Sequence, residues 1–145
     1  MTRTQHIIEI INTILSNANL EILDKYVESD QVLEAKTAYS FIIAEKEEDF
    51  YENQLAFEMT SMILCYIDFR IDDFNDSFTD KKNLILQDIE DSRISSDLTL
   101  SRSIDNFVLS SSVPKILSVS GNFDTNYSKG ILDLVFEVKT LASPK

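Results

Sequence analysis

A strict alternation of side chains runs through residues 55–71 and constrains this chain more than any other feature. The odd positions from Leu55 to Ile71 are apolar except for Ser61, whereas the even positions include Glu58 and Asp68. A period of two predicts one long β-strand with one face in the core. At roughly 3.3 Å per residue such a strand extends about 50 Å. We therefore expect it to bend at a bulge or to project beyond its sheet.

An amphipathic helix is predicted near the N-terminus. Thr2 and Gln5 form a capping-box pattern, and the residues 17–19 (Asn-Ala-Asn) are typical of a helix end. The apolar residues between these signals recur at spacings of three and four, which places them on one stripe. They are Ile7, Ile8, Ile11, Ile14, Leu15 and Ala18.

A second helix is expected after the long strand. Phe74, Phe78, Ile85 and Ile89 recur at helical spacing, and residues 95–97 (Ser-Ser-Asp) end the pattern. The carboxylates Asp72, Asp73 and Asp76 precede or open this helix, where they suit the positive end of its dipole.

The remaining segments favour strands. Tyr39–Ala44 is typical of a buried strand, and residues 98–109 and 116–123 are strand-like. Leu20–Ala38 is irregular or a short strand. The last strand places four residues on the core face: Leu132, Leu134, Phe136 and Val138. The predicted order is α-β-β-α-β-β-β, an α+β fold with a mixed, mainly antiparallel sheet and both helices packed on one face.

Composition indicates one domain, spanning residues 1–145. Hydrophobic residues make up 43% of the 145, enough for a self-sustaining core. The apolar runs are too short for a membrane span, and the first residues do not resemble a signal peptide. A single cysteine, Cys65, excludes an internal disulfide and suits the reducing cytoplasm.

The residue types that carry catalysis are scarce, so we expect neither enzyme activity nor a cofactor. Cys65 is predicted to be an inert buried thiol, and His6 a solvated side chain. One histidine and one cysteine do not make a common zinc site, and Gly121 and Gly130 do not make a phosphate-binding loop. The acidic segment Glu45–Asn53 lacks the spacing of a calcium loop.

That acidic segment is instead our candidate contact region. It is predicted to connect two strands, and it contains Phe50 and Tyr51 followed by Glu52. Aromatic residues within a charged loop are common at interfaces, although they also pack back onto a sheet. We expect Phe50, Tyr51 and Glu52 to contact another subunit or a partner.

Net charge is the most skewed property of the chain. Thirteen Lys and Arg against 25 Asp and Glu give −12. Such a surface repels a phosphate backbone, which argues against ordinary duplex binding. The charge indicates solubility, a basic protein partner, or a surface that nucleic acid passes without adhering.

The order of elements resembles that of the tail terminator proteins of long-tailed bacteriophages. The matching segments are a helix at Thr4–Leu15, a short strand at Tyr39–Ala44, a long strand at Leu55–Asp72, a helix at Phe74–Asp91 and a closing pair of strands. The nearest match is that final pair, Ile116–Asp124 and Gly130–Val138.

This resemblance implies a structural role in the virion tail and neck, after assembly in the host cytoplasm. Such proteins form a homohexameric ring that stops growth of the tail tube and joins it to the head-side connector protein. DNA passes through the bore without specific binding, and acidic residues keep it from adhering. The candidate bore-lining acids are Glu47, Glu48, Asp72 and Asp73, because they lie at strand ends rather than on a packed face. The end of the long strand is expected to pair with a neighbouring subunit.

A second class of protein fits the composition equally well. Small, acidic immunity or antitoxin proteins neutralise a basic toxin by complementary charge. A ring of about six subunits in solution supports the tail protein, whereas a monomer supports the immunity protein.

Overall fold

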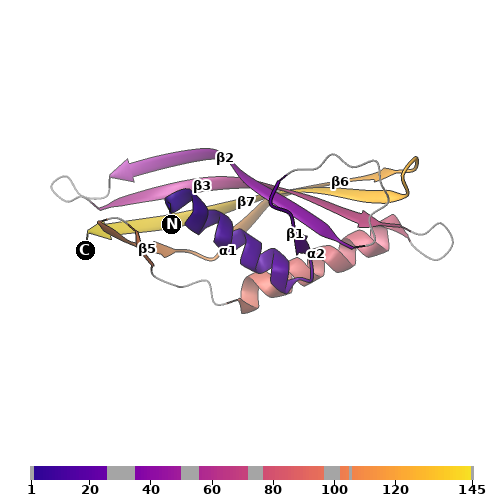
Figure 1. Ribbon diagram of the computed structural model, residues 1–145, viewed down its shortest axis with the longest axis horizontal. Helices are drawn as coiled ribbons and strands as arrows, with labels where there is room; N and C mark the ends of the chain where they lie inside the picture. Colours follow the sequence, from indigo (N-terminus) through magenta and orange to yellow (C-terminus); the bar gives the residue numbers. More distant parts are fainter. Residues whose placement is uncertain are drawn as a thin grey trace.

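Residues 2–25, 35–49, 56–71, 77–96, 102–104 and 106–144 are described by the computed structural model, shown in Figure 1. The two helices are α1 (Arg3–Asn17) and α2 (Phe78–Ser95). The strands are β1 (Glu21–Ile22), β2 (Thr37–Asp49), β3 (Phe57–Arg70), β4 (Arg102–Ile104), β5 (Phe107–Ser111), β6 (Lys115–Asp124) and β7 (Lys129–Pro144). The α+β class and the expected order of elements are confirmed, with the two short strands β1 and β4 added.

Local sequence signals explain both helix starts. The Gln5 amide donates to Thr2 Oγ1 at 3.1 Å, and the Thr2 amide donates to Gln5 Oε1 at 2.7 Å, so the predicted capping box is present. After Asn17, Asn19 adopts a positive φ of 66°, as expected at this helix end. The second helix begins at Phe78 behind the N-cap Ser77. Its expected start at Phe74 lies outside the described residues.

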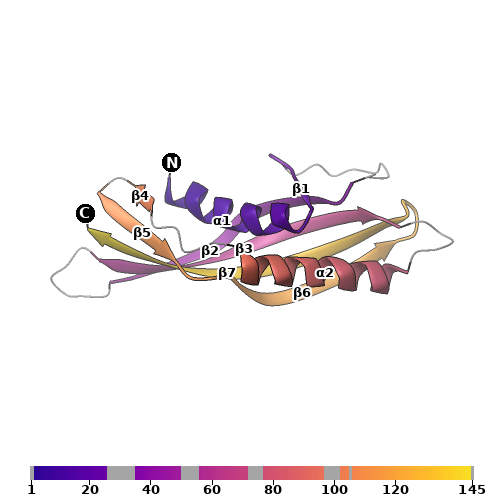
Figure 2. The same ribbon diagram turned by 90° about the horizontal axis from the view of Figure 1, so that it is seen from below.

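The strands form one sheet in the order β1-β2-β3-β7-β5-β4, and β6 also pairs with β7. β1 is parallel to β2, and all other pairs are antiparallel. β6 and β5 follow one another along the same side of β7, because β6 pairs with residues 129–137 and β5 with residues 140–144. Figure 2 shows β6 on the outer side of the sheet, beside α2.

The long strand does not project from the sheet, which corrects the expectation for its end. β3 pairs with β7 from Phe57 to Arg70 and with β2 from Phe57 to Asp68, so both of its sides are occupied. The bulge lies in the neighbouring strand β2, between Ile42 and Ala44. β3 is therefore the central strand, and it has no free edge for a neighbouring subunit.

The predicted acidic connection also needs correction. Glu45–Asp49 continue β2 and pair with Ser61–Phe57 of β3. Charged side chains are tolerated there because β2 lies at the side of the sheet and its outward groups remain in water. Leu20–Ala38 contains the two-residue strand β1, and the expected strand at 98–109 is described as the separate strands β4 and β5, the latter ending at Ser111.

The core lies between the helices and one face of the sheet. The odd residues of β3 from Met59 to Ile71 are buried, as the alternation predicts. The four predicted core residues of β7 are each 0% exposed, and they pack in the same cluster as Ile11 of α1 and Ile89 of α2. Ser92 Oγ of α2 donates to the carbonyl oxygen of Ile14 at 2.6 Å, which joins the C-terminal parts of the two helices. Neither helix is long and apolar enough to cross a membrane within the described ranges.

Candidate interaction surface

The face of the sheet that points away from the helices is named the open face. The even residues of β3 and the odd residues of β7 belong to it, because side chains alternate along a strand. Its centre is half-buried and carries Tyr39, Phe41, Leu64, Tyr66 and Val135. The Phe41 ring centroid lies 5.8 Å from that of Tyr39 and 5.6 Å from that of Tyr66. A contiguous apolar and aromatic surface of this kind, rimmed by charges, is typical of a protein contact.

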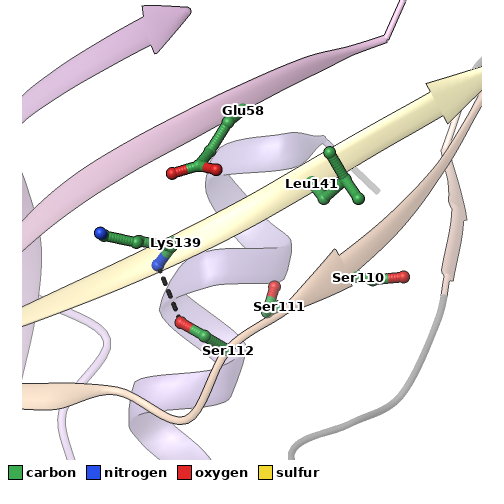
Figure 3. Close-up of a pocket in the computed structure, with 6 residues that line it drawn as sticks. All are labelled: Glu58, Ser110, Ser111, Ser112, Lys139 and Leu141. Carbon is green, nitrogen blue, oxygen red and sulfur yellow. Dashed lines mark hydrogen bonds between the residues drawn. The ribbon is translucent and has the colours of Figure 1, made fainter. Parts of the chain in front are cut away.

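One end of the open face is hollowed and charged. Two adjoining hollows of about 380 and 400 Å³ share Glu58 of β3 and Lys139 of β7. Figure 3 shows the first hollow, with α1 behind the strands and with Ser110 and Ser112 beside the end of β7. The Lys139 amide donates to Ser112 Oγ at 3.2 Å, which holds the segment after β5 against β7.

The second hollow brings together charges of both signs. Glu48 of β2 lies directly opposite Glu58 of β3, and Lys46 Nζ is 2.9 Å from Glu48 Oε1. The hydrogen bond from Lys46, together with its positive charge, lowers the pKa of the Glu48 carboxyl. Glu137 and Lys139 complete the hollow from β7. Alternating charges of this kind suit a salt-sensitive contact with another polar surface.

The other end of the open face contains a carboxylate pair and one lysine. Lys129 Nζ lies 3.3 Å from Asp68 Oδ2. Burial raises the pKa of the Asp133 carboxyl, and the negative charge of Asp68 adds to the rise. Asp133 Oδ1 is buried and has no hydrogen-bond partner among the described residues. Asp68 lies on β3 and Asp133 on β7, and the positive charge of Lys129 partly offsets their negative charges.

The side chains with potential for covalent chemistry are enclosed. Cys65 is 0% exposed, and burial raises the pKa of its thiol to about 12, although a hydrogen bond from Ser40 Oγ at 3.1 Å opposes the rise. The predicted solvated state of His6 is wrong: its side chain is only 2% exposed. His6 Nε2 lies 3.1 Å from Ser111 Oγ, which lies 3.1 Å from Thr140 Oγ1. This chain of polar groups joins α1, β5 and β7 inside the molecule.

Metal ligands are not gathered at any point of the described ranges. No three side chains of His, Cys, Asp or Glu are placed there to hold an ion.

Of the predicted site residues, the described ranges contain Glu47 and Glu48, and these two lie on opposite faces of β2. Glu47 points to the helix side of β2, where Arg3 Nη1 donates to its Oε1 at 2.8 Å. Glu48, the next residue, belongs to the open face. Asp72 and Asp73, like Phe50, Tyr51 and Glu52, lie outside the described residues.

The acidic excess of the chain is concentrated in those remaining segments. Nine of the 25 acidic residues, but one of the 13 basic ones, fall outside the described ranges. On the open face, by contrast, Glu48, Glu58 and Glu137 are accompanied by Lys46 and Lys139. The sheet surface is thus mixed in charge rather than uniformly acidic.

The outer edges of β2 and β6 were not predicted as sites, because pairing with a neighbouring subunit was expected at the end of the long strand instead. Seven of the ten residues of β6 from Leu117 to Phe123 are exposed in a continuous run. The sequence signal for this was the lack of charged residues between Lys115 and Asp124.

A comparison with protein-family models and with curated protein sequences finds no match to this chain.

Proposed function

We propose that this protein is a structural subunit of the virion, which assembles as a homohexameric ring on the end of a bacteriophage tail tube. The ring ends tube growth and joins the tail to the head-side connector protein. Its partners are further copies of itself, the tail tube protein and the connector. DNA passes through the bore without specific contacts.

The observation that carries this proposal is the pair of strands at the two sides of the sheet. β2 and β6 both run along the sheet for ten residues or more, and both helices lie on one face between them. Identical subunits placed side by side then form a closed ring by one repeated head-to-tail contact. In such a ring the helices form one layer and the sheets form the other. The order of elements resembles that of tail terminator proteins, and this resemblance is the basis for placing the ring on a phage tail.

The charge distribution supports the same function. A bore that DNA traverses must repel phosphate, and the chain carries a net charge of −12.

Electron microscopy of virions assembled without this protein tests the proposal. Loss of a cap should give tails that are longer than normal, or tails that do not join heads, because nothing stops the tube polymer or completes its upper end. Complementation with the intact gene is the control, and it should restore uniform joined tails. Normal tails joined to heads in the absence of the protein would refute the capping function.

A further inference from the structure

The strand β6 presents an unguarded edge. Its only charged residues are Lys115 and Asp124 at its two ends, and Leu117, Val119 and Phe123 are 40%, 44% and 36% exposed. No strand pairs with its outer side within the described residues. Soluble proteins protect such edges with charges, proline or a covering segment, because a bare edge templates pairing with another chain. The bulge between Ile116 and Ser118 protects only the start of β6.

The opposite side of the sheet ends in β2, and among the described strands β1 alone lies beyond it. β1 pairs with Thr37 and Ala38 alone. Residues 43–48 are all exposed, and Glu45, Glu47 and Glu48 make this half of the strand acidic. The part of β2 that follows its pairing with β1, residues 39–49, is about as long as β6.

Strand directions determine how these two edges meet. β6 is antiparallel to β7, β7 to β3, and β3 to β2, so β6 and β2 run in opposite directions. Rotation of a second copy about an axis inclined to the strands, as in a closed β-barrel, brings its β2 beside β6 as an antiparallel neighbour. The helices of the two copies then remain on the same side, and the sheet continues across the contact.

The charges of the two edges are complementary in this arrangement. Antiparallel pairing places the start of β6, with Lys115, beside the end of β2, with Glu47 and Glu48. The uncharged part of β6 then faces the part of β2 that contains Phe41 and Ile42. Pairing in the parallel sense would instead place Asp124 beside the acidic half of β2.

We propose that the outer edge of β6 binds the outer edge of β2 of a second copy of this chain, as an antiparallel continuation of the sheet. Residues 115–124 of one copy lie along residues 39–48 of the next. The proposal rests on the proposed ring function and specifies the contact that closes the ring.

Chemical cross-linking tests this contact. Placing residues 115–124 along residues 39–48 brings Ser120 of β6 next to Ile43, the bulge residue of β2, in the next copy, and both side chains are exposed. The full chain carrying Ser120→Cys and Ile43→Cys, treated with a short bis-maleimide, should give a ladder of covalent multimers on a denaturing gel. Each single variant should stay monomeric on that gel. The unsubstituted chain is the matched control, because Cys65 is buried with a raised pKa.

Other cross-linking patterns overturn the proposal. Covalent dimers from Ser120→Cys alone would show that two β6 strands pair with each other around a two-fold axis. Dimers from Ile43→Cys alone would show the same for β2. Absence of any ladder, with the native chain monomeric by light scattering at the concentration used for cross-linking, would exclude the contact.

A charge exchange provides an independent readout. Lys115→Glu should weaken self-association roughly twofold to fivefold, the range of an exposed ion pair. Lys115→Arg should leave it unchanged, and Lys115→Glu combined with Glu48→Lys should restore part of the loss. Equal weakening by Lys115→Glu and Lys115→Arg would contradict the proposed pairing.

The two proposals fail in different experiments. Overlong tails without the protein, together with no cross-linked ladder, would leave the capping function standing and refute the edge pairing. A cross-linked ladder together with normal tails would establish the pairing and refute the capping function.

Discussion

His6 of α1 and Ser111 of β5 are joined inside the protein, with His6 Nε2 3.1 Å from Ser111 Oγ. Both side chains are buried, and Ser111 Oγ also lies 3.1 Å from Thr140 Oγ1 of β7. The N-terminal helix is thereby tied to the end of the sheet where β5 replaces β6 beside β7. Apolar contacts alone do not fix such a position, because they are not directional.

We expect Ser111→Ala to destabilise the fold by about 1–3 kcal/mol, because buried polar groups of His6 and Thr140 lose a partner. For a chain of this length that corresponds to a fall in Tm of roughly 3–10 °C. Ser120→Ala, at an exposed position of β6, is the matched control and should change Tm by no more than about 2 °C. Equal melting temperatures for the two variants would contradict a structural role of this contact.

Asp133 is expected to reduce stability at neutral pH. Burial, with Asp68 nearby, raises the pKa of the Asp133 carboxyl in the folded state. As pH rises from about 4, the unfolded chain releases this proton before the folded chain does, so the free energy of unfolding falls. The loss is complete once pH exceeds the raised folded pKa.

Asp133→Asn removes this titration, since an amide has a similar shape and no charge. The variant should melt at a higher temperature than the original chain at pH 7, and the difference should shrink as pH falls below 4. Ser120→Ala, at an exposed position without an ionisable side chain, is a control that should not show this pH profile. A lower Tm of Asp133→Asn at pH 7 would refute the interpretation.

Phe136 should be among the most costly residues to truncate. Its side chain is 0% exposed and packs in the main core. Phe136→Ala should cost about 3–5 kcal/mol, because the lost apolar contacts leave a cavity. Val135→Ala, at the adjacent position on the open face, should cost clearly less in denaturant unfolding. A Tm shift of only a degree or two for Phe136→Ala would contradict its predicted role.

Cys65 should react with a thiol reagent only after unfolding. Its side chain is enclosed, and burial raises the thiol pKa to about 12, so almost no thiolate exists at pH 8. Native protein should show negligible absorbance change with Ellman's reagent, and denatured protein should react fully. A Ser120→Cys variant should gain one rapidly reacting thiol. Fast reaction of native Cys65 would reveal opening between β2 and β3.

Much of the fold follows from patterns that packing strongly enforces. The alternation of β3 and β7 is set by a sheet with one face against the helices, so the burial of Ile63 and Leu134 was predictable. The Thr2–Gln5 cap is a local signal and was also predictable. The choice of which strands pair was not predictable, because strands pair through backbone groups, and these carry no sequence information. The continuation of β2 through Glu45–Asp49 was therefore missed.

The candidate site was less predictable than the fold. His6 was expected in water because histidine is polar and lies near the N-terminus, but its partner Ser111 is distant in the sequence. Glu47 and Glu48 were grouped by their sequence proximity, whereas the strand sends them to opposite faces. The position of β6 at an edge depends on the pairing of β7 with β3, a strand far away in the sequence, which no local pattern reports.

The opposite orientations of Glu47 and Glu48 make it possible to determine which layer of the ring lines the bore. In a ring with one sheet layer and one helical layer, the outer layer has the larger circumference and therefore more room. The helices are bulkier than the sheet, so they fit best on the outside. We therefore expect the open face to line the bore. Glu48 then faces the DNA, whereas Glu47 and its partner Arg3 lie on the helix side.

Glu48→Lys should slow DNA ejection from assembled virions, because it places a positive charge beside Lys46 and Lys139 on the open face, where phosphate passes. Added salt should ease the delay, since it screens exposed charges over about 10 Å at 0.1 M. Glu47→Lys is the matched control: it adds the same charge one residue away and should leave ejection unchanged if heads and tails still join. Glu48→Gln should give an intermediate rate, because it removes one negative charge without adding a positive one. Slower ejection by Glu47→Lys than by Glu48→Lys would show that the helical layer lines the bore, and equal rates for both would show that neither residue faces the DNA.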